Sequence, residues 1–264
     1  MLLEIEDLDV SFRTDEGDAV RAACDVNLTL ERGEVLGIVG ESGSGKSSVA
    51  MSVARLLPSP PAFWPKGRIL LDGQDVLKMP LDELRLLRGS KIGVVFQDPM
   101  GSLSPLHRIG DQLVETVLLH EDVSRRAARE RAVEWLGKVG LPDPAARAQA
   151  YPHELSGGMQ QRVMIAMGLM LDPDLVIADE PTTALDVTIQ AQVLELMKRL
   201  HRAKSAILLI THDLGVVSQM ATRLAVMKGG RVVETADDPA AFFSHPNHPY
   251  SQALIGEAKK MELE

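Results

Sequence analysis

The chain has 264 residues, of which 45% are hydrophobic and 25% charged, as in an ordinary globular protein. This length suits one large domain or two closely packed ones. The formal net charge of −9 argues against a nucleic-acid surface, because phosphate contacts need clustered lysines and arginines. The single cysteine, Cys24, excludes an intramolecular disulfide framework and fits a reducing compartment.

The sequence holds no segment that looks able to cross a bilayer. The longest apolar stretches, such as residues 206–210, are far too short. The first residues include Glu4, Glu6 and Asp7, where a signal peptide needs basic residues. We therefore expect a cytoplasmic chain that reaches a membrane only through partner proteins.

In chain order, short apolar runs alternate with helix-length segments, the pattern of an α/β domain around a mostly parallel sheet. Two amphipathic segments near residues 2–5 and 26–30 are expected to form an antiparallel accessory sheet. Continuous apolar runs indicate strands that are buried on both faces, and they cover residues 35–39, 92–95, 175–178 and 207–210.

A helical block interrupts this alternation from about residue 109 to 168, where a long helix starts after Ser124 and stops at Gly140. Because the block lies between two core strands, it is interpreted as an insertion. The expected division is a core of residues 1–97 and 172–236, a helical subdomain of residues 98–171, and a short helical tail of residues 237–264.

A glycine-rich P-loop follows the strand at residues 35–39 and opens a helix expected through Val49, Val53 and Leu56. Its glycines let backbone N–H groups point at phosphate oxygens, and the helix start adds partial positive charge. Lys46 should reach the β- and γ-phosphates, and Ser47 should be a ligand of Mg²⁺. A flexible Gly/Ser turn is the alternative. The predicted phosphate-binding residues are Gly40, Ser42, Gly43, Ser44, Gly45, Lys46, Ser47 and Ser48.

Two acidic residues follow the apolar strand at residues 175–178. Ligands of doubly wound sheets bind at the carboxyl ends of the strands. Asp179 is therefore predicted to orient Mg²⁺ and Glu180 to polarise the attacking water as general base. The alternative is a strand that ends in a solvated acidic turn.

A third motif is Leu155-Ser156-Gly157-Gly158-Met159-Gln160-Gln161-Arg162. It resembles the signature sequence of ABC ATPases, with Met in place of the commoner Gln. The resemblance implies a P-loop NTPase (RecA-like) core, an N-terminal antiparallel β subdomain and an inserted α-helical subdomain. It also implies head-to-tail dimers, in which Ser156, Gly157 and Gly158 contact the nucleotide on the partner's P-loop.

The same resemblance assigns further residues. Gln97 matches the Q-loop glutamine, which senses Mg²⁺ and the γ-phosphate, and residues 184–186 match the D-loop at the dimer interface. His212 matches the switch histidine, which contacts the γ-phosphate and holds Glu180. Phe12 has the place of the aromatic ring that stacks on adenine, although a core phenylalanine in an early strand is the alternative.

Four segments resemble the dipeptide, oligopeptide and nickel importer branch: residues 37–47, 96–100, 102–105 and 178–188. The tail motif at residues 245–250 is also typical of that branch. His245 and His248 lie in a proline-broken loop without a nearby third ligand, so a helix-capping or subunit-contact loop is expected rather than a metal site. No cysteine follows this motif, and no iron–sulfur cluster is expected.

The resemblance thus implies an ATP-hydrolysing subunit of an ABC importer, bound peripherally to the cytoplasmic face of the inner membrane. It would form a homo- or heterodimer around two ATP and Mg²⁺, contact transmembrane permease subunits and serve a separate substrate-binding protein. Peptides are the first expectation for the cargo. An ATPase for nickel or a metal chelate, or an accessory ATPase of a soluble metabolic complex, remains an alternative.

Overall fold

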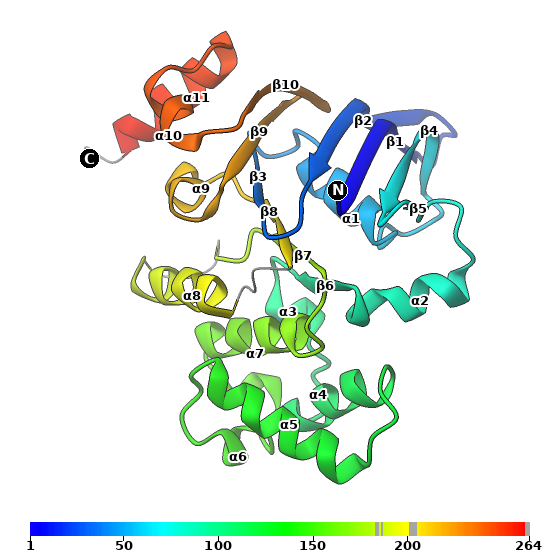
Figure 1. Ribbon diagram of the computed structural model, residues 1–264, viewed down its shortest axis with the longest axis vertical. Coiled ribbons are helices and arrows are strands. Elements are labelled where there is room, and N and C mark those ends of the chain that lie inside the picture. The colour runs from blue at the N-terminus through cyan, green and yellow to red at the C-terminus, as the bar shows by residue number, and fades with distance from the viewer. Residues whose placement is uncertain (183–184, 186, 201–204, 262–264) are drawn as a thin grey trace. The chain divides into compact units, whose positions relative to one another are not determined.

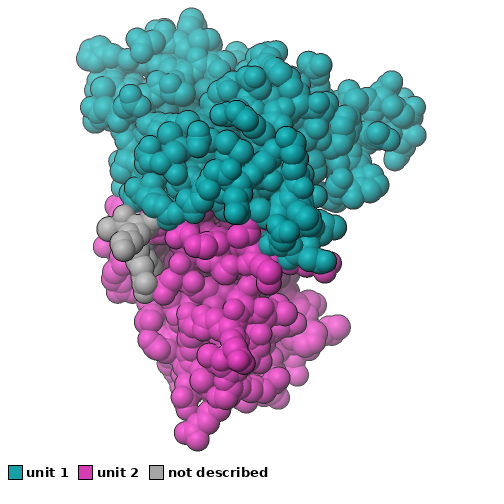
Figure 2. Space-filling model, turned by 45° about the vertical axis from the view of Figure 1, so that its right-hand side comes forward, with its two compact units in different colours: residues 1–84, 206–264 teal, residues 85–205 magenta. Residues whose placement is uncertain are grey.

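The computed structural model describes the chain except residues 183–184, 186, 201–204 and 262–264. The chain forms two compact units, coloured separately in Figure 2. Unit 1 comprises residues 1–84 and 206–264, and unit 2 comprises residues 85–205. Within the described part of the chain, no helix combines the length and apolar character needed to cross a bilayer.

Unit 1 contains an antiparallel sheet near the N-terminus (Figure 1). Its strand order is β2-β1-β4-β5, with β1 at Leu3–Arg13, β2 at Ala19–Leu30, β4 at Ala62–Leu71 and β5 at Gln74–Asp75. Apolar residues of β1 such as Leu3, Ile5 and Leu8 are buried. The accessory sheet is therefore present, and β1 and β2 extend well beyond the predicted segments because β1 pairs along its length with both neighbours.

The second group of strands in unit 1 is mostly parallel. The strand β3 (Val35–Val39) pairs in parallel with β8 (Ala206–Ile210) and β9 (Arg223–Lys228), while β10 (Arg231–Ala236) runs antiparallel to β9. Every residue of β3 and β8 is buried, as their continuous apolar sequences predict. The helices of this unit are α1 (Lys46–Val53), α9 (Leu214–Met220), α10 (Pro239–Ser244) and α11 (Pro249–Met261).

The helix α1 ends at Val53, so the expectation that it continues through Leu56 is wrong. Arg55 adopts a left-handed conformation with φ 49°. The Leu56 N–H donates to the Met51 carbonyl at 2.9 Å and the Arg55 N–H to the Ser52 carbonyl at 3.0 Å. These bonds form a Schellman-type end, which usually carries glycine at the left-handed position. With arginine there, the sequence lacked its usual stop signal.

Unit 2 combines two parallel strands, β6 (Ile92–Val95) and β7 (Leu175–Asp179), with helices. Ser124 caps the longest helix of the insertion as expected, because its hydroxyl accepts from the Ala127 N–H at 3.2 Å. Helix α2 (Leu81–Ser90) carries the boundary between the units and is broken at Arg88 and Gly89. The other helices are α3 (Pro99–Ser102), α4 (Ile109–Leu118), α5 (Arg125–Lys138), α6 (Pro144–Arg147), η1 (Pro152–Glu154), α7 (Gly157–Leu169) and α8 (Val187–Leu200).

Unit 2 contains the whole of the predicted helical subdomain, residues 98–171, together with β6, β7 and α8. The predicted tail, residues 237–264, is part of unit 1. The finer division into a core, a helical subdomain and a tail stays a prediction of the sequence.

Candidate active site

The P-loop of unit 1 connects the end of β3 to the start of α1 and is closed around a lysine. Lys46 is only 4% exposed. Its ammonium donates to the carbonyls of Gly40 and Glu41, at 2.8 Å each, and to the Ser44 hydroxyl at 3.4 Å. The cationic group is therefore held inside the loop by the loop's own oxygens.

Gly45 caps α1 in a left-handed conformation, with φ 99°. A Cβ atom at this position would lie 2.2 Å from the Ala22 carbonyl oxygen, a distance that backbone atoms cannot relieve. Glycine is thus required both by its dihedral angle and by the close approach of β2. The packing of the loop against β2 therefore explains why the motif has glycine at position 45.

The side of the loop that remains accessible carries Ser42, Gly43 and Ser47, which are all exposed. Ser48 is half-buried, and its carbonyl accepts from the Ser52 hydroxyl at 2.6 Å. N–H groups and hydroxyls on an exposed loop at a helix N-terminus suit a phosphate. The contacts that these residues would make with a phosphate stay a prediction.

In unit 2, two predicted residues meet at the ends of neighbouring strands. Gln97 follows β6 and Glu180 follows β7, and these strands pair in parallel with Val95 opposite Ala178. The Gln97 amide nitrogen donates to the Glu180 carboxylate at 3.1 Å. Glu180 has φ 45°, an uncommon conformation for a residue other than glycine and one that often marks functional sites. Asp179, the last residue of β7, is 8% exposed.

The signature segment of unit 2 forms the start of α7. Ser156 is the capping residue, and its hydroxyl accepts from the Met159 N–H at 3.4 Å. Gln160, buried one turn later, donates to the carbonyls of Pro152 at 2.8 Å and Leu155 at 3.2 Å. These bonds fix the chain before the helix, while Ser156 and Gly157 stay exposed.

The two glycines of this segment differ in their surroundings. A Cβ on Gly157 would meet nothing within 4 Å, whereas one on Gly158 would lie 2.9 Å from the Ile189 side chain of α8. Close packing therefore accounts for Gly158. Neither a left-handed conformation nor any neighbour in the described part of the chain accounts for Gly157.

His212 and Phe12 lie in unit 1. His212 is exposed between β8 and α9, and Asp213 caps that helix by accepting from the Gly215 N–H at 2.8 Å. Phe12 is half-buried in β1, opposite Val20 of β2 and Ala62 of β4. Stacking on adenine stays a prediction for Phe12, as does the phosphate contact of His212.

Of the predicted D-loop, Ala184 and Asp186 lie outside the described residues. Only Leu185 is described, and its N–H donates to the Thr182 carbonyl at 3.1 Å.

Two neighbours of the P-loop were missed in the sequence. The Gly230 N–H, in the turn between β9 and β10, donates to the Ser44 carbonyl at 3.0 Å. The Glu41 N–H donates to the hydroxyl of Tyr250, in the tail motif, at 3.1 Å. The tail motif was visible as a pattern, but its target is 209 residues away in the chain.

Comparisons with known proteins agree with this geometry. The profile of the family described as "ABC transporter" matches residues 23–183. The oligopeptide transport ATP-binding protein OppD of Bacillus subtilis (strain 168) is 50% identical over 262 residues, which are 99% of this chain and 73% of that protein. The dipeptide transport ATP-binding protein DppD of the same organism is 47% identical over 263 residues, with coverage of 99% and 78%.

Among solved structures, the dimeric post-hydrolysis state of the ATP-binding cassette MJ0796 bound to ADP and Pi matches with a TM-score of 0.79. It is 29% identical, and the match covers 89% of this chain and 98% of that one. The fold is therefore that of an ATP-binding cassette, and the predicted fold class, an α/β P-loop NTPase with antiparallel and helical subdomains, is confirmed. The chain belongs to the ABC transporter family.

Proposed function

We propose that this chain is the ATP-hydrolysing subunit of an ABC importer that takes up peptides. The observation that carries the hydrolytic part is the pairing of Gln97 with Glu180 at the ends of two parallel strands. The Gln97 amide orients this carboxylate at the ends of the two strands, and a carboxylate is a group that can act as a general base. The P-loop supplies the phosphate site, and the relatives named for oligopeptide and dipeptide transport support the cargo.

In the proposed reaction, Lys46 keeps the Gly40 carbonyl and exchanges its bonds to the Glu41 carbonyl and the Ser44 hydroxyl for β- and γ-phosphate oxygens, while the P-loop N–H groups bind the remaining phosphate charge. Glu180 accepts a proton from the water that attacks the γ-phosphorus, and ADP leaves with the bridging oxygen. Gln97 orients the Glu180 carboxylate through its amide, and His212 contacts the γ-phosphate. Phe12 stacks on the adenine ring.

Mg²⁺ is part of this proposal, and the candidate ligands fit it. Ser47, Gln97 and Asp179 offer a hydroxyl, an amide oxygen and a carboxylate, the oxygen donors that Mg²⁺ prefers. Among the described residues, no group of three or more His, Cys, Asp or Glu side chains could hold a metal ion. Bound by these candidate ligands, Mg²⁺ would neutralise charge on the β- and γ-phosphates.

Dimerisation is supported by Gly157. Because no neighbour in the described part of the chain comes within 4 Å of a Cβ at this position, the side chain is absent where a second molecule could approach. The exposed N-terminus of α7 would then bind the γ-phosphate of a nucleotide on the partner's P-loop through Ser156, Gly157 and Gly158. The partner is a second copy or a sister ATPase. The matched structures of the MJ0796 cassette are dimeric.

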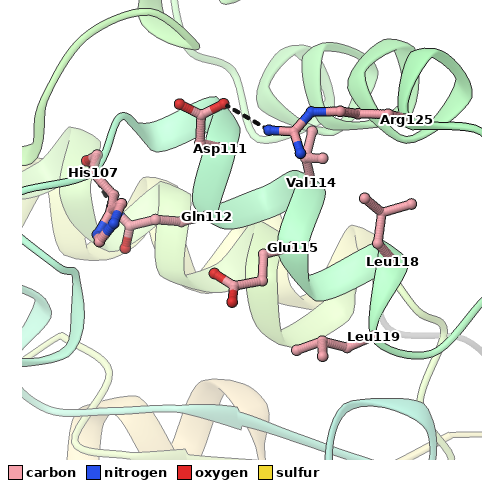
Figure 3. Close-up of a pocket in the computed structure, with 8 residues that line it drawn as sticks. All are labelled: His107, Asp111, Gln112, Val114, Glu115, Leu118, Leu119 and Arg125. Atoms are coloured by element: carbon pink, nitrogen blue, oxygen red, sulfur yellow. Dashed lines mark hydrogen bonds and ion pairs between the residues drawn. The ribbon is translucent and has the colours of Figure 1, made fainter.

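A groove in unit 2 offers a surface for the permease subunits at the cytoplasmic face of the inner membrane (Figure 3). Leu118 and Leu119 at the end of α4 line it, and Leu119 is 67% exposed. Gln112 is nearly buried and bonds to the backbone of Ser104 and His107, so it ties the chain before α4 to that helix. An exposed groove that places leucines beside charged residues such as Glu115 and Arg125 suits a short amphipathic helix of a membrane subunit. A separate binding protein would deliver the peptide.

A Glu180→Gln chain tests the proposal. It should keep ATP affinity but lose hydrolysis on the order of 100-fold or more, and with ATP it should run as a dimer on gel filtration. Hydrolysis at the wild-type rate would refute the role of Glu180. Lys46→Ala is the control for binding, since it should weaken ATP affinity itself.

The same Glu180→Gln chain tests the transport role in a pull-down from native membranes with ATP, followed by mass spectrometry. Recovery of two multi-span proteins, with or without a sister ATPase, is expected. Recovery of soluble enzymes only would overturn the transport role and leave the ATPase intact.

A further inference from the structure

The tail motif of unit 1 bonds directly to the P-loop. Tyr250, at the start of α11, is 6% exposed, and its hydroxyl accepts from the Glu41 N–H at 3.1 Å. Glu41 is the second residue of the loop, and its amide is aimed at the tail. This is a contact between the loop and a segment more than 200 positions later in the sequence.

The bonded amide belongs to a peptide unit that also contacts Lys46. The N–H of Glu41 and the carbonyl of Gly40 are parts of one planar trans peptide, so they point in opposite directions. The carbonyl accepts from the Lys46 ammonium at 2.8 Å while the N–H donates to Tyr250. The tyrosine therefore fixes the orientation of the peptide that presents an acceptor to the P-loop lysine.

The tail holds Tyr250 rigidly. Glu234 of β10 accepts from the N–H groups of Asn247 at 2.8 Å and His248 at 3.0 Å. The Tyr250 N–H in turn donates to the His248 ring at 3.1 Å. These bonds fix the proline-broken loop ahead of α11 and make the carboxylate of Glu234 its anchor.

The ring of Tyr250 also packs on the strand that precedes the P-loop and on the helix that follows His212. It belongs to a buried apolar cluster with Val39, the last residue before the loop, and with Leu214 and Val217 of α9, the helix after His212. The Lys228 ammonium lies 4.4 Å from the ring centroid, a cation–π contact. Burial raises the pKa of Tyr250, which keeps the hydroxyl neutral.

We propose that Tyr250 is a positioning residue for nucleotide binding: it holds the Gly40–Glu41 peptide in the orientation that keeps Lys46 at the phosphate site. The role rests on the proposed function of the P-loop. A phenylalanine would fill the same space and leave the Glu41 N–H without this acceptor, so the hydroxyl is the group to remove.

Tyr250→Phe is therefore the test. The KM for ATP should rise about fivefold, the size of one neutral hydrogen bond, while kcat stays within about twofold because the hydroxyl does not touch the reacting atoms. Hydrogen exchange of the Glu41 amide, followed by NMR without nucleotide, should accelerate about tenfold. Phe242→Leu is the matched control: it perturbs the same cluster without a bond to the loop, so it should lower Tm and leave KM and exchange unchanged.

Unchanged KM and unchanged exchange in Tyr250→Phe would overturn the proposal. An equal rise of KM in Phe242→Leu would also overturn it, because the effect would then come from packing. If Lys46→Ala leaves ATP affinity intact, the proposed function of the loop fails, while the exchange rate of Glu41 still reports whether Tyr250 orients the peptide.

Discussion

Two helix N-termini of this chain contain glycine and serine, and they are built differently. At the P-loop, the cap of α1 is Gly45 in a left-handed conformation, and the loop encloses Lys46. At the signature segment, the cap of α7 is Ser156, which uses its own hydroxyl, and the glycines that follow are ordinary helical residues. The P-loop is enclosed by contacts within unit 1, so we call it the closed terminus. Ser156 and Gly157 at the start of α7 are exposed, so we call that end the open terminus.

The difference shows that glycine has two separate uses in these motifs. Gly45 is needed because the chain itself comes too close, with the Ala22 carbonyl 2.2 Å from a Cβ. Gly157 has open space around it in the described part of the chain, so packing there does not require a glycine. This difference agrees with the proposal that the loop binds phosphate within one chain, whereas the start of α7 binds a nucleotide on a partner.

The largest expected effect is on the closed terminus. Gly45→Ala should lower the free energy of unfolding by about 3 kcal/mol, since it adds a backbone clash to a strained φ. Gly43→Ala is the control: its φ of 77° is also left-handed, but a Cβ there meets nothing within 4 Å, so the loss should be only about 1 kcal/mol. Urea unfolding without nucleotide measures both, and equal losses would contradict the packing argument.

At the open terminus, the effect should appear in hydrolysis and not in stability. Gly157→Leu should keep Tm and ATP affinity but lower ATP hydrolysis on the order of 100-fold, about 2.7 kcal/mol, by blocking the partner's nucleotide. Gly137→Leu changes an exposed helical glycine of the same unit and should leave hydrolysis unchanged. Hydrolysis at the wild-type rate by Gly157→Leu would contradict the proposal that the N-terminus of α7 binds the partner's nucleotide.

The smallest expected effect separates capping from ligand binding. Ser156→Ala and Ser124→Ala each remove a hydroxyl cap, so each should cost about 1 kcal/mol of unfolding free energy. Only Ser156→Ala should also lower hydrolysis. Steady-state ATPase assays beside thermal unfolding would show this, and equal activity of the two variants would reduce Ser156 to a cap.

Local chemistry made much of this architecture predictable. The strand before the P-loop has the predicted bounds because a short apolar run between Glu34 and Gly40 has few alternatives. Gln97 and Glu180 were each expected directly after a strand, and their contact, which was not predicted, arises because these strands pair in parallel and end at one edge.

The end of α1 and the bond between Glu41 and Tyr250 were not predicted, because both depend on contacts between segments far apart in the sequence. The end of α1 depends on Arg55, whose guanidinium donates to the Met79 carbonyl at 2.6 Å. The bond from Glu41 to Tyr250 depends on packing of the tail. A sequence motif can indicate that a segment such as the tail is important without showing which residues it contacts.

The internal bonds of Lys46 bear on how a nucleotide exchanges. The ammonium already has carbonyl and hydroxyl acceptors at hydrogen-bonding distance, so its desolvation accompanies folding and not ligand capture. Under the proposed function, an arriving phosphate would displace neutral oxygens of the loop in place of bulk water, and a departing one would return the cation to them. ADP would then dissociate without leaving a buried charge unpaired.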